Sequence, residues 1–212
     1  MILAIDTTRE FGSIALLADG EILEEVLLHA EDGFGHVIYG HLATLLDRHG
    51  CHVDDIDCFA AAAGPGSFTG VRVGLACVKG LADATGKPMV AVSNLQAMAA
   101  FGKSSLRAIV LDARRGEIYG AVYDAELNPV IPEVVMKLPD WLRTLPEGVE
   151  FVVEPDYSSV LPVVTEAPRA LAGAIARIAA SNLRGGLAID AAQADANYIR
   201  RSDAELLWKP AS

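Results

Sequence analysis

A glycine-rich loop constrains the fold of this chain more than any other stretch. Residues 58–63 are apolar without alternation, which predicts a strand buried on both faces. The Gly-Pro-Gly sequence at 64–66 ends that strand, because proline lacks the amide hydrogen and glycine allows backbone angles that a side chain forbids. Ser67 or Thr69 can then cap a helix over 68–84, since either hydroxyl can accept a hydrogen bond from an amide of the first turn. The loop therefore predicts an α/β protein with a strand-to-helix turn at its centre.

The predicted helix has one side built from small residues. Gly70, Gly74 and Cys77 recur at i, i+4 and i+7, so they form one stripe along which another backbone could pack closely. The loop before the helix has two interpretations. Its amides and the positive end of the helix dipole could bind a phosphate or carboxylate, or it could be a tight turn that binds nothing. Its glycine spacing matches neither a Walker loop nor a dinucleotide fingerprint.

Composition limits the partners of the chain. The 212 residues are 52% hydrophobic with a net charge of -11, which is typical of a globular protein and unfavourable for direct binding of an RNA backbone. Cys51, Cys58 and Cys77 form no CxxC pair, so we expect reduced thiols in a cytoplasmic protein. We also expect no signal peptide and no membrane span, because the sequence has neither a basic-then-apolar start nor a long enough apolar run.

The first predicted strand ends in a turn with a carboxylate and two hydroxyls. Residues 2–5 are apolar, Asp6-Thr7-Thr8 follows, and segments 13–18 and 21–28 form a hairpin around Asp19-Gly20. The side-chain oxygen atoms of the Asp-Thr-Thr turn could face a nucleotide phosphate or its magnesium ion. Alternatively, the three residues form an Asx-type turn whose side chains bond their own backbone.

The order of the elements predicts a mixed sheet in the first hundred residues. An amphipathic helix over 35–49 follows the hairpin, and the central strand and helix come next. A strand at 89–93 and a helix from residue 95 to about 101 complete the set. A meander followed by alternating helices and strands gives a mixed sheet with helices on its faces.

Beyond the polar stretch 102–105 the pattern begins again. A strand ends in Asp112, a turn follows and a second strand returns, which indicates duplicated halves. The turn carries two arginines beside two acids, so it could be an anion clamp or a salt-bridged turn. A helix over 168–183 comes late in the second half. We predict two domains of the same kind, 1–101 and 105–212.

Histidines in and near the first helix do not have the spacing of a metal site. His36 and His41 are five residues apart, which rotates one by about 140° from the other on a helix of 3.6 residues per turn. Two imidazoles that bind one metal ion need spacing of three or four residues. We therefore expect no metal site here.

The chain resembles the bacterial TsaB (YeaZ) family over nearly its whole length. It has four motifs in the order of that family: Ile5-Asp-Thr-Thr8, Gly64-Pro-Gly-Ser-Phe-Thr-Gly-Val-Arg-Val-Gly74, Asp112-Ala-Arg-Arg-Gly-Glu-Ile-Tyr119 and Tyr198-Ile-Arg. The resemblance implies the actin-like ATPase (ASKHA) fold of sugar kinases, Hsp70 and actin, with two similar α/β halves. It also implies a role in making threonylcarbamoyladenosine on tRNA. The chain departs from the family at Asp32-Gly-Phe-Gly, where a polar run is more usual, and in a short C-terminal half.

The resemblance implies a subunit that has no catalytic activity alone. TsaB proteins bind and activate their paralogue, the transferase TsaD, and the ATPase TsaE joins the pair. The resemblance also implies a homodimer in isolation and contact with tRNA only through the complex. TsaD-type enzymes hold a metal through paired histidines at i, i+4, whereas here the fourth residue after His36 is Gly40. We therefore expect no catalytic residue and no metal.

The resemblance implies no cofactor bound by this chain alone. ATP or ADP with Mg²⁺ is expected only in the complex with TsaD and TsaE. Asp6, Thr7, Thr8 and Asp112 are the candidate nucleotide ligands.

The resemblance also implies a partner interface on the first two helices, here about 35–49 and 68–84. A side-chain-poor stripe would let a bundle of four helices close tightly. We predict these interface residues: His36, Leu42, Leu45, Leu46, Gly70, Val71, Gly74, Cys77 and Val78.

Two other functions stay open. The chain could be an enzyme of the same fold that binds or hydrolyses ATP with Asp6 and the turn at Asp112. It could also be a glycoprotease-like peptidase with Ser67 as nucleophile, although it lacks a Gly-x-Ser-x-Gly elbow and a recognisable His and Asp set.

Overall fold

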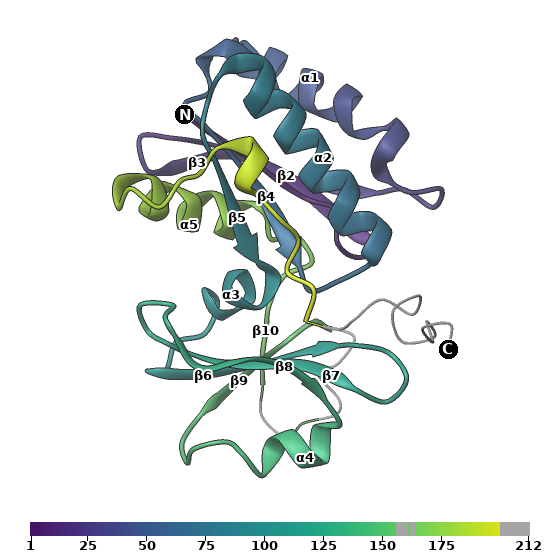
Figure 1. Ribbon diagram of the computed structural model, residues 1–212, viewed down its shortest axis with the longest axis vertical. Coiled ribbons are helices and arrows are strands. Elements are labelled where there is room, and N and C mark those ends of the chain that lie inside the picture. Colours follow the sequence, from purple (N-terminus) through teal and green to yellow (C-terminus); the bar gives the residue numbers. More distant parts are fainter. Residues whose placement is uncertain (156–160, 162–163, 200–212) are drawn as a thin grey trace, which may run out of the picture.

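The computed structural model describes residues 1–155, 161 and 164–199, and the chain forms two sheets with helices between and outside them (Figure 1). The first sheet holds β1 (Ile2–Asp6), β2 (Phe11–Ala18), β3 (Glu21–His29), β4 (Cys58–Gly64) and β5 (Met89–Ser93). The second holds β6 (Leu106–Asp112), β7 (Ile118–Asp124), β8 (Pro129–Met136), β9 (Glu150–Val153) and β10 (Val164–Glu166). The α-helices are α1 (Ile38–Arg48), α2 (Phe68–Thr85), α3 (Asn94–Ala99), α4 (Leu138–Leu142) and α5 (Ala172–Arg184). Short 3-10 turns are η1 (Phe34–His36), η2 (Val53–Asp55) and η4 (Ala191–Gln193).

The two sheets have the same topology. In the first sheet, of order β3-β2-β1-β4-β5, the strands from β1 to β3 are antiparallel and β4 and β5 are parallel to β1. In the second sheet, of order β8-β7-β6-β9-β10, β6 takes the place of β1. Asp6 and Asp112 therefore stand at the same end of equivalent central strands. The predicted actin-like fold with two similar halves is confirmed.

Alternating side chains of β1 supply two different cores. Leu3 and Ile5 pack with residues of α1 and α2 on one face of the first sheet. Ile2 and Ala4 face the other way and pack with α5 and α3. Successive side chains of a strand point to opposite faces, so an apolar run such as β1 is buried on both.

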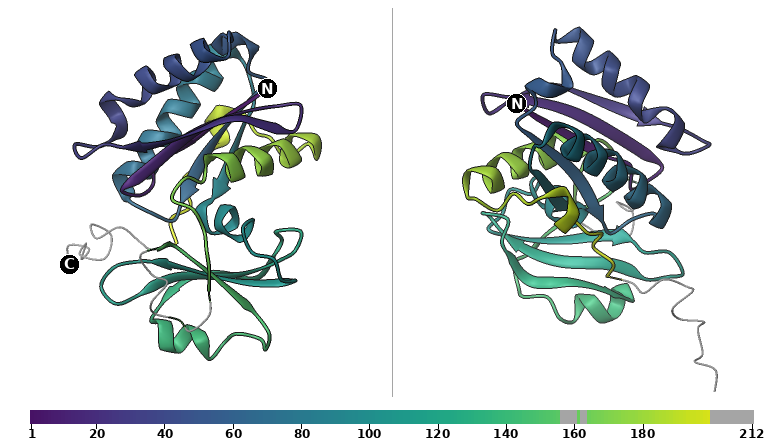
Figure 2. Two further views of the ribbon diagram at one scale, coloured as in Figure 1. Left: turned by 180° about the vertical axis from the view of Figure 1, so that it is seen from behind. Right: turned by 45° about the horizontal axis from the view of Figure 1, so that its top comes forward.

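The layers follow from these cores. The core that contains α5 and α3 also includes Ile109 and Val152 of the second sheet, so it fills the space between the two sheets. A third core on the far face of the second sheet surrounds the fully buried Trp141 of α4. From one end to the other the molecule is α1 and α2, first sheet, α5 and α3, second sheet, and α4 (Figure 2).

Helix α5 follows the second sheet in sequence but packs on the first. It contacts β1, β2 and β4. The two predicted segments, 1–101 and 105–212, each contain one sheet, but α5 belongs to the second segment in sequence and packs on the sheet of the first. The helix begins at Ala172 rather than at the predicted 168, since 167–171 is the crossing segment and its ends, Ala167 and Leu171, are fully buried. Arg200 of the Tyr198-Ile-Arg motif, and residues 201–212, lie outside the described part of the chain.

Side chains of the first sheet cap this helix. The buried Ser13 Oγ on β2 accepts hydrogen bonds from the amides of Leu171 at 3.0 Å and Ala172 at 2.9 Å. Glu25 Oε1 on β3 accepts one from the amide of Gly173 at 2.7 Å. These amides have no partner within the helix, so β2 and β3 satisfy the N-terminus of a helix that comes from the other half.

Replacing Ser13 with alanine should lower the free energy of unfolding by about 2 kcal/mol, because two buried amides lose their acceptor. Denaturant unfolding of the full chain measures the change. Ser181→Ala on the exposed side of the same helix is the control and should stay within about 0.5 kcal/mol of the parent. Equal effects of the two substitutions would contradict the capping role of Ser13.

Candidate functional site

The turn after β1 is closed by its own side chains. Asp6 Oδ1 accepts hydrogen bonds from the Thr8 amide at 2.9 Å and the Thr8 hydroxyl at 2.6 Å. Thr8 Oγ1 in turn accepts one from Asn94 Nδ2 at 2.7 Å, and Thr7 Oγ1 donates to the carbonyl of Gly70 at 2.7 Å. The Asx-type turn, one of the two interpretations of the sequence, is the arrangement found, and it occupies both hydroxyls and one carboxylate oxygen.

Asp6 retains one oxygen without a hydrogen bond. Among the described residues the buried Oδ2 has no hydrogen-bond partner, and it lies 3.9 Å from Nη2 of Arg9, at the limit of an ion pair. Arg9 also lies 3.8 Å from Glu154 and donates a hydrogen bond to the carbonyl of Arg169 at 3.1 Å. If a cation or a polar ligand approaches this turn, Asp6 Oδ2 is the atom left to receive it.

The turn after β6 repeats the arrangement of the first. Asp112 Oδ1 accepts from the Arg114 amide at 2.8 Å, and Oδ2 lies 3.3 Å from Arg114 Nη1. Arg114, Arg115 and Gly116 have φ of 63°, 57° and 75°, a left-handed conformation that is uncommon for arginine. Of the two alternatives for this turn, the salt-bridged one describes the contact between Asp112 and Arg114.

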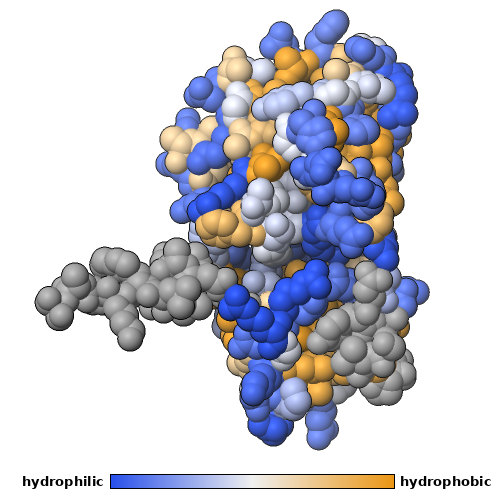
Figure 3. All heavy atoms as spheres, turned by 90° about the vertical axis from the view of Figure 1, so that its right-hand side faces the viewer, coloured by the Kyte–Doolittle hydropathy of each residue, from blue (hydrophilic) through white to orange (hydrophobic). Residues whose placement is uncertain are grey.

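Both turns line one cleft with a volume of about 860 Å³ between the two halves. Thr8, the glycine loop at Gly66 and Ser67, and Asp112 meet in its walls, although they are far apart in sequence. Figure 3 shows hydrophilic side chains on both sides of the waist where the halves meet. Thr7 and Asp6 do not line this cleft. Binding of ATP or ADP with Mg²⁺ stays a prediction.

The glycine stripe of α2 packs against its own chain. A Cβ atom at Gly70 would lie 2.1 Å from the carbonyl oxygen of Thr7, and one at Gly74 would lie 2.6 Å from Thr7 Oγ1. Cys77, the next member, is buried in the core that α1 and α2 form with the first sheet. The prediction that this stripe receives a second protein is therefore wrong. Because Gly70 and Gly74 have no side chain, α2 can lie close to the turn after β1.

Most other predicted interface side chains are also internal. They lie in the core between α1, α2 and the first sheet, so they cannot contact another protein: Leu42, Leu45, Leu46, Val71 and Val78. The amphipathic pattern that selected them marks the side of each helix that faces its own sheet. His36 is exposed, and with Gly70 it lines a smaller cleft of about 610 Å³ beside the start of α2.

The outward side of the same two helices carries four small residues among exposed charged ones such as Asp47 and Arg72. Gly40 and Ala43 on α1 and Ala76 and Gly80 on α2 are exposed, and a Cβ at either glycine would meet nothing within 4 Å. Tyr39, 58% exposed, is the large apolar residue beside them. We call these five residues the outer face. None of the five was predicted from the sequence, although Ala76 and Gly80 have the same spacing of small residues as Gly70 and Gly74.

The remaining predictions concern Ser67, the three cysteines, a metal site and a membrane span. Ser67 is the N-cap of α2, and its Oγ accepts a hydrogen bond from the Gly70 amide at 3.3 Å. All three cysteines are free thiols, and burial raises the pKa of the Cys58 thiol to about 11. In the described part of the chain no three His, Cys, Asp or Glu side chains lie together as metal ligands would. Nor is any described helix long and apolar enough to cross a membrane.

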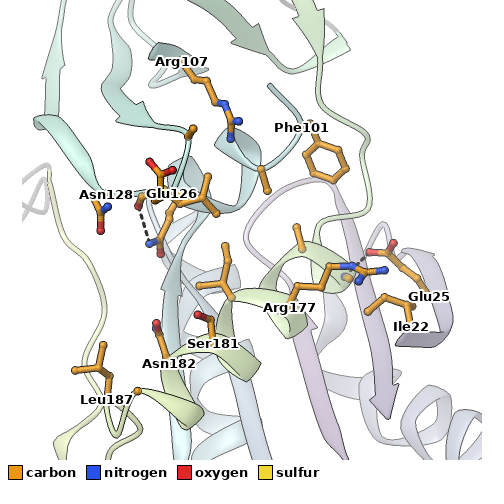
Figure 4. A pocket seen from close by; sticks show the side chains of 18 residues that line it. Ile22, Glu25, Phe101, Arg107, Glu126, Asn128, Arg177, Ser181, Asn182 and Leu187 are labelled. Atoms are coloured by element: carbon orange, nitrogen blue, oxygen red, sulfur yellow. Dashed lines mark hydrogen bonds between the residues drawn. The ribbon is translucent and has the colours of Figure 1, made fainter. Parts of the chain in front are cut away.

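A third hollow, a cavity with a volume of about 880 Å³, lies between α5 and the turn that joins β7 to β8. Figure 4 shows Arg107 and Phe101 on one side of it and Ser181 and Asn182 of α5 on the other. Two of its lining residues are joined by a hydrogen bond of 3.2 Å from Gln96 Nε2 to the Leu127 carbonyl. None of the predicted site residues lines this cavity.

Comparisons with known proteins agree with the fold and the motifs. A family model described as TsaD, tRNA N6-adenosine threonylcarbamoyltransferase, matches residues 30–167. Over 151 residues the chain is 34% identical to a Bacillus subtilis protein described as tRNA threonylcarbamoyladenosine biosynthesis protein TsaB, and over 133 residues it is 37% identical to the Escherichia coli protein of the same description. The solved structure of YeaZ from Pseudomonas aeruginosa superposes with a TM-score of 0.79 at 26% identity and covers 93% of this chain and 98% of that one. The chain belongs to the TsaB (YeaZ) family.

The Bacillus subtilis and Escherichia coli relatives are both described as threonylcarbamoyladenosine biosynthesis proteins. The aligned regions cover 69% and 61% of this chain and 66% and 57% of the two TsaB relatives, so less than two thirds of either relative is matched. The two halves, the closed turn after β1 and the capped glycine loop described above are therefore features of a TsaB protein.

Proposed function

We propose that this chain is the non-catalytic partner subunit that binds and activates a TsaD-type transferase in threonylcarbamoyladenosine biosynthesis. The ATPase TsaE joins the pair, and tRNA is reached through the complex. The net charge of -11 supports the last point, because a chain with this charge repels an RNA backbone unless a partner supplies the basic surface.

The outer face is the observation that carries the proposal. Gly40, Ala43, Ala76 and Gly80 leave the backbones of α1 and α2 accessible, so helices of another protein can approach closely. Tyr39 at the edge offers an aromatic side chain of the kind enriched at interface centres. The interface predicted on these two helices is thus retained, with the outward residues in place of the buried ones.

Homology between the subunits supports the same geometry. Residues 30–167, which include α1 and α2, match the family model of the transferase itself. Two related helix pairs can meet around a local two-fold axis and form a four-helix contact. Without the transferase, the same face pairs with a second copy of this chain, and the homodimer exchanges for the heterodimer.

Reconstitution tests the proposed function. The purified chain is mixed with a TsaD-type transferase and TsaE, and modification of tRNA is measured with and without it. We expect modification to need the chain and a stable pair with the transferase to appear in size-exclusion chromatography. Equal modification without the chain, or no association of the purified pair, would contradict the proposal.

A further inference from the structure

A segment near the end of the described chain ties the two halves together. Residues 194–199, which we call the strap, run from η4 beside α2 towards β8 (Figure 1). Lys79 Nζ on α2 donates a hydrogen bond to the Ala194 carbonyl at 2.8 Å, and the Asn197 amide donates to the Ala63 carbonyl on β4 at 2.8 Å. These contacts fix the strap to the first half.

One carboxylate joins the strap to the second half. Glu133 on β8 accepts a hydrogen bond from Asn197 Nδ2 at 2.5 Å through Oε2. Its Oε1 accepts from Tyr123 Oη on β7 at 2.6 Å and from Ser93 Oγ at the end of β5. Ser93 also caps α3, and its neighbour Asn94 holds the turn after β1. Glu133 therefore receives one donor from each half and one from the strap.

The residue after Asn197, Tyr198, packs against side chains at the start of α2. Tyr198 is 47% exposed, its Oη accepts a hydrogen bond from Arg72 Nε at 3.0 Å, and its ring lies 5.4 Å from that of Phe68. The Arg72 guanidinium lies 3.5 Å from the centre of the Phe68 ring. A molecule that binds beside the first turns of α2 can therefore contact the strap directly.

We propose that the strap couples this part of α2 to the second half through the pair Asn197 and Glu133. When Tyr198 is held on α2, Asn197 is held against Glu133 and the strand β8 is tied to the first half. When Tyr198 is displaced, Glu133 loses the Asn197 donor and keeps those of Ser93 and Tyr123, so β8 is held less firmly to the first half. The consequence for binding rests on the proposed function, since a transferase docked on α2 would strengthen the coupling, but the coupling itself belongs to the isolated chain.

Two substitutions, which together exchange the hydrogen-bond donor and acceptor of Asn197 and Glu133, test the proposal. Asn197→Asp is isosteric and sets a second carboxylate against Glu133, so the hydrogen bond is replaced by repulsion. Combining it with Glu133→Gln restores a donor and an acceptor with the roles reversed. Hydrogen exchange of the full chain is followed in residues 129–136 and in 68–72. We expect roughly tenfold or faster exchange in both segments for Asn197→Asp, and near-parental rates for the double variant.

A matched control and a milder variant complete the test. Glu150→Gln changes another hydrogen-bonded glutamate of the second sheet, which holds the amides of Lys103 and Ser104, and should affect exchange near those residues and not in α2. If Asn197→Asp does not fold, Tyr198→Phe, which removes only the hydroxyl, should still speed exchange in 129–136 a few-fold.

Three results would overturn the coupling: unchanged exchange in β8 for Asn197→Asp, no restoration by Glu133→Gln, or an unchanged β8 in Tyr198→Phe. Because these assays use the isolated chain, they decide the coupling even if no transferase binds. A chain that binds the transferase normally but gives any of these results would leave the proposed function intact and refute the coupling.

Discussion

Gly70→Ala is expected to lower the free energy of unfolding by about 2 kcal/mol. The new Cβ would lie 2.1 Å from the Thr7 carbonyl oxygen, which belongs to the backbone of a buried turn and cannot rotate away. Relief requires α2 or the end of β1 to shift, and Thr7 Oγ1 would then lose its hydrogen bond to the Gly70 carbonyl. Overpacking of this kind typically costs 1–3 kcal/mol, which outweighs the gain of about 1 kcal/mol that alanine brings to a helix.

Gly80→Ala on the same helix is the control for Gly70→Ala. Nothing lies within 4 Å of the added Cβ at Gly80, so only the helix propensity acts and the variant should be more stable by about 0.5–1 kcal/mol. Urea unfolding of both variants measures the two changes. Opposite signs are expected, and a stabilised Gly70→Ala would contradict the close approach of α2 to the turn after β1.

Ala76→Arg should weaken binding of a TsaD-type transferase by roughly a hundredfold or more. The alanine is an exposed member of the outer face, so a long charged side chain there would separate the two helix pairs and leave a buried charge without a partner. The fold should be unaffected, because the substituted side chain points to solvent in the free chain. Isothermal titration calorimetry with the purified transferase gives the affinity.

Ala125→Arg is the matched control for the interface. It makes the same change at an exposed position in the turn that joins β7 to β8, away from α1 and α2. The transferase should bind this variant as it binds the parent. Equal loss for the two variants would mean that the added charge acts over a distance, and no loss for either would move the interface elsewhere.

Most of the fold was predictable because its local signals agree. The apolar runs of β1, β4 and β6, the Asp19-Gly20 turn and the Ser67 cap each specify one local conformation. The repeated order of strands then gave the duplication. Strand β10 was missed, since its three residues are too short to show a period. The late start of α5 was missed because the caps come from Ser13 and Glu25, more than a hundred residues earlier.

Most of the residues predicted for the interface lie on the inward sides of α1 and α2. Helix α2 has small residues on two stripes, and the sequence alone gives no reason to prefer Ala76 and Gly80 over Gly70 and Gly74. What decides between them is the position of Thr7, whose backbone fills the space beside the inner stripe. Leu42 and Leu45 were misplaced for the same reason, because an apolar helix face packs first on its own sheet.

Site-specific photo-crosslinking tests the central claim, that the outer face receives the transferase, most directly. A photoreactive amino acid is placed at position 43, 76 or 125, and the chain is irradiated with the purified transferase. The account predicts a crosslinked pair from positions 43 and 76 and none from 125. Crosslinks from position 125 with none from 43 or 76 would contradict it.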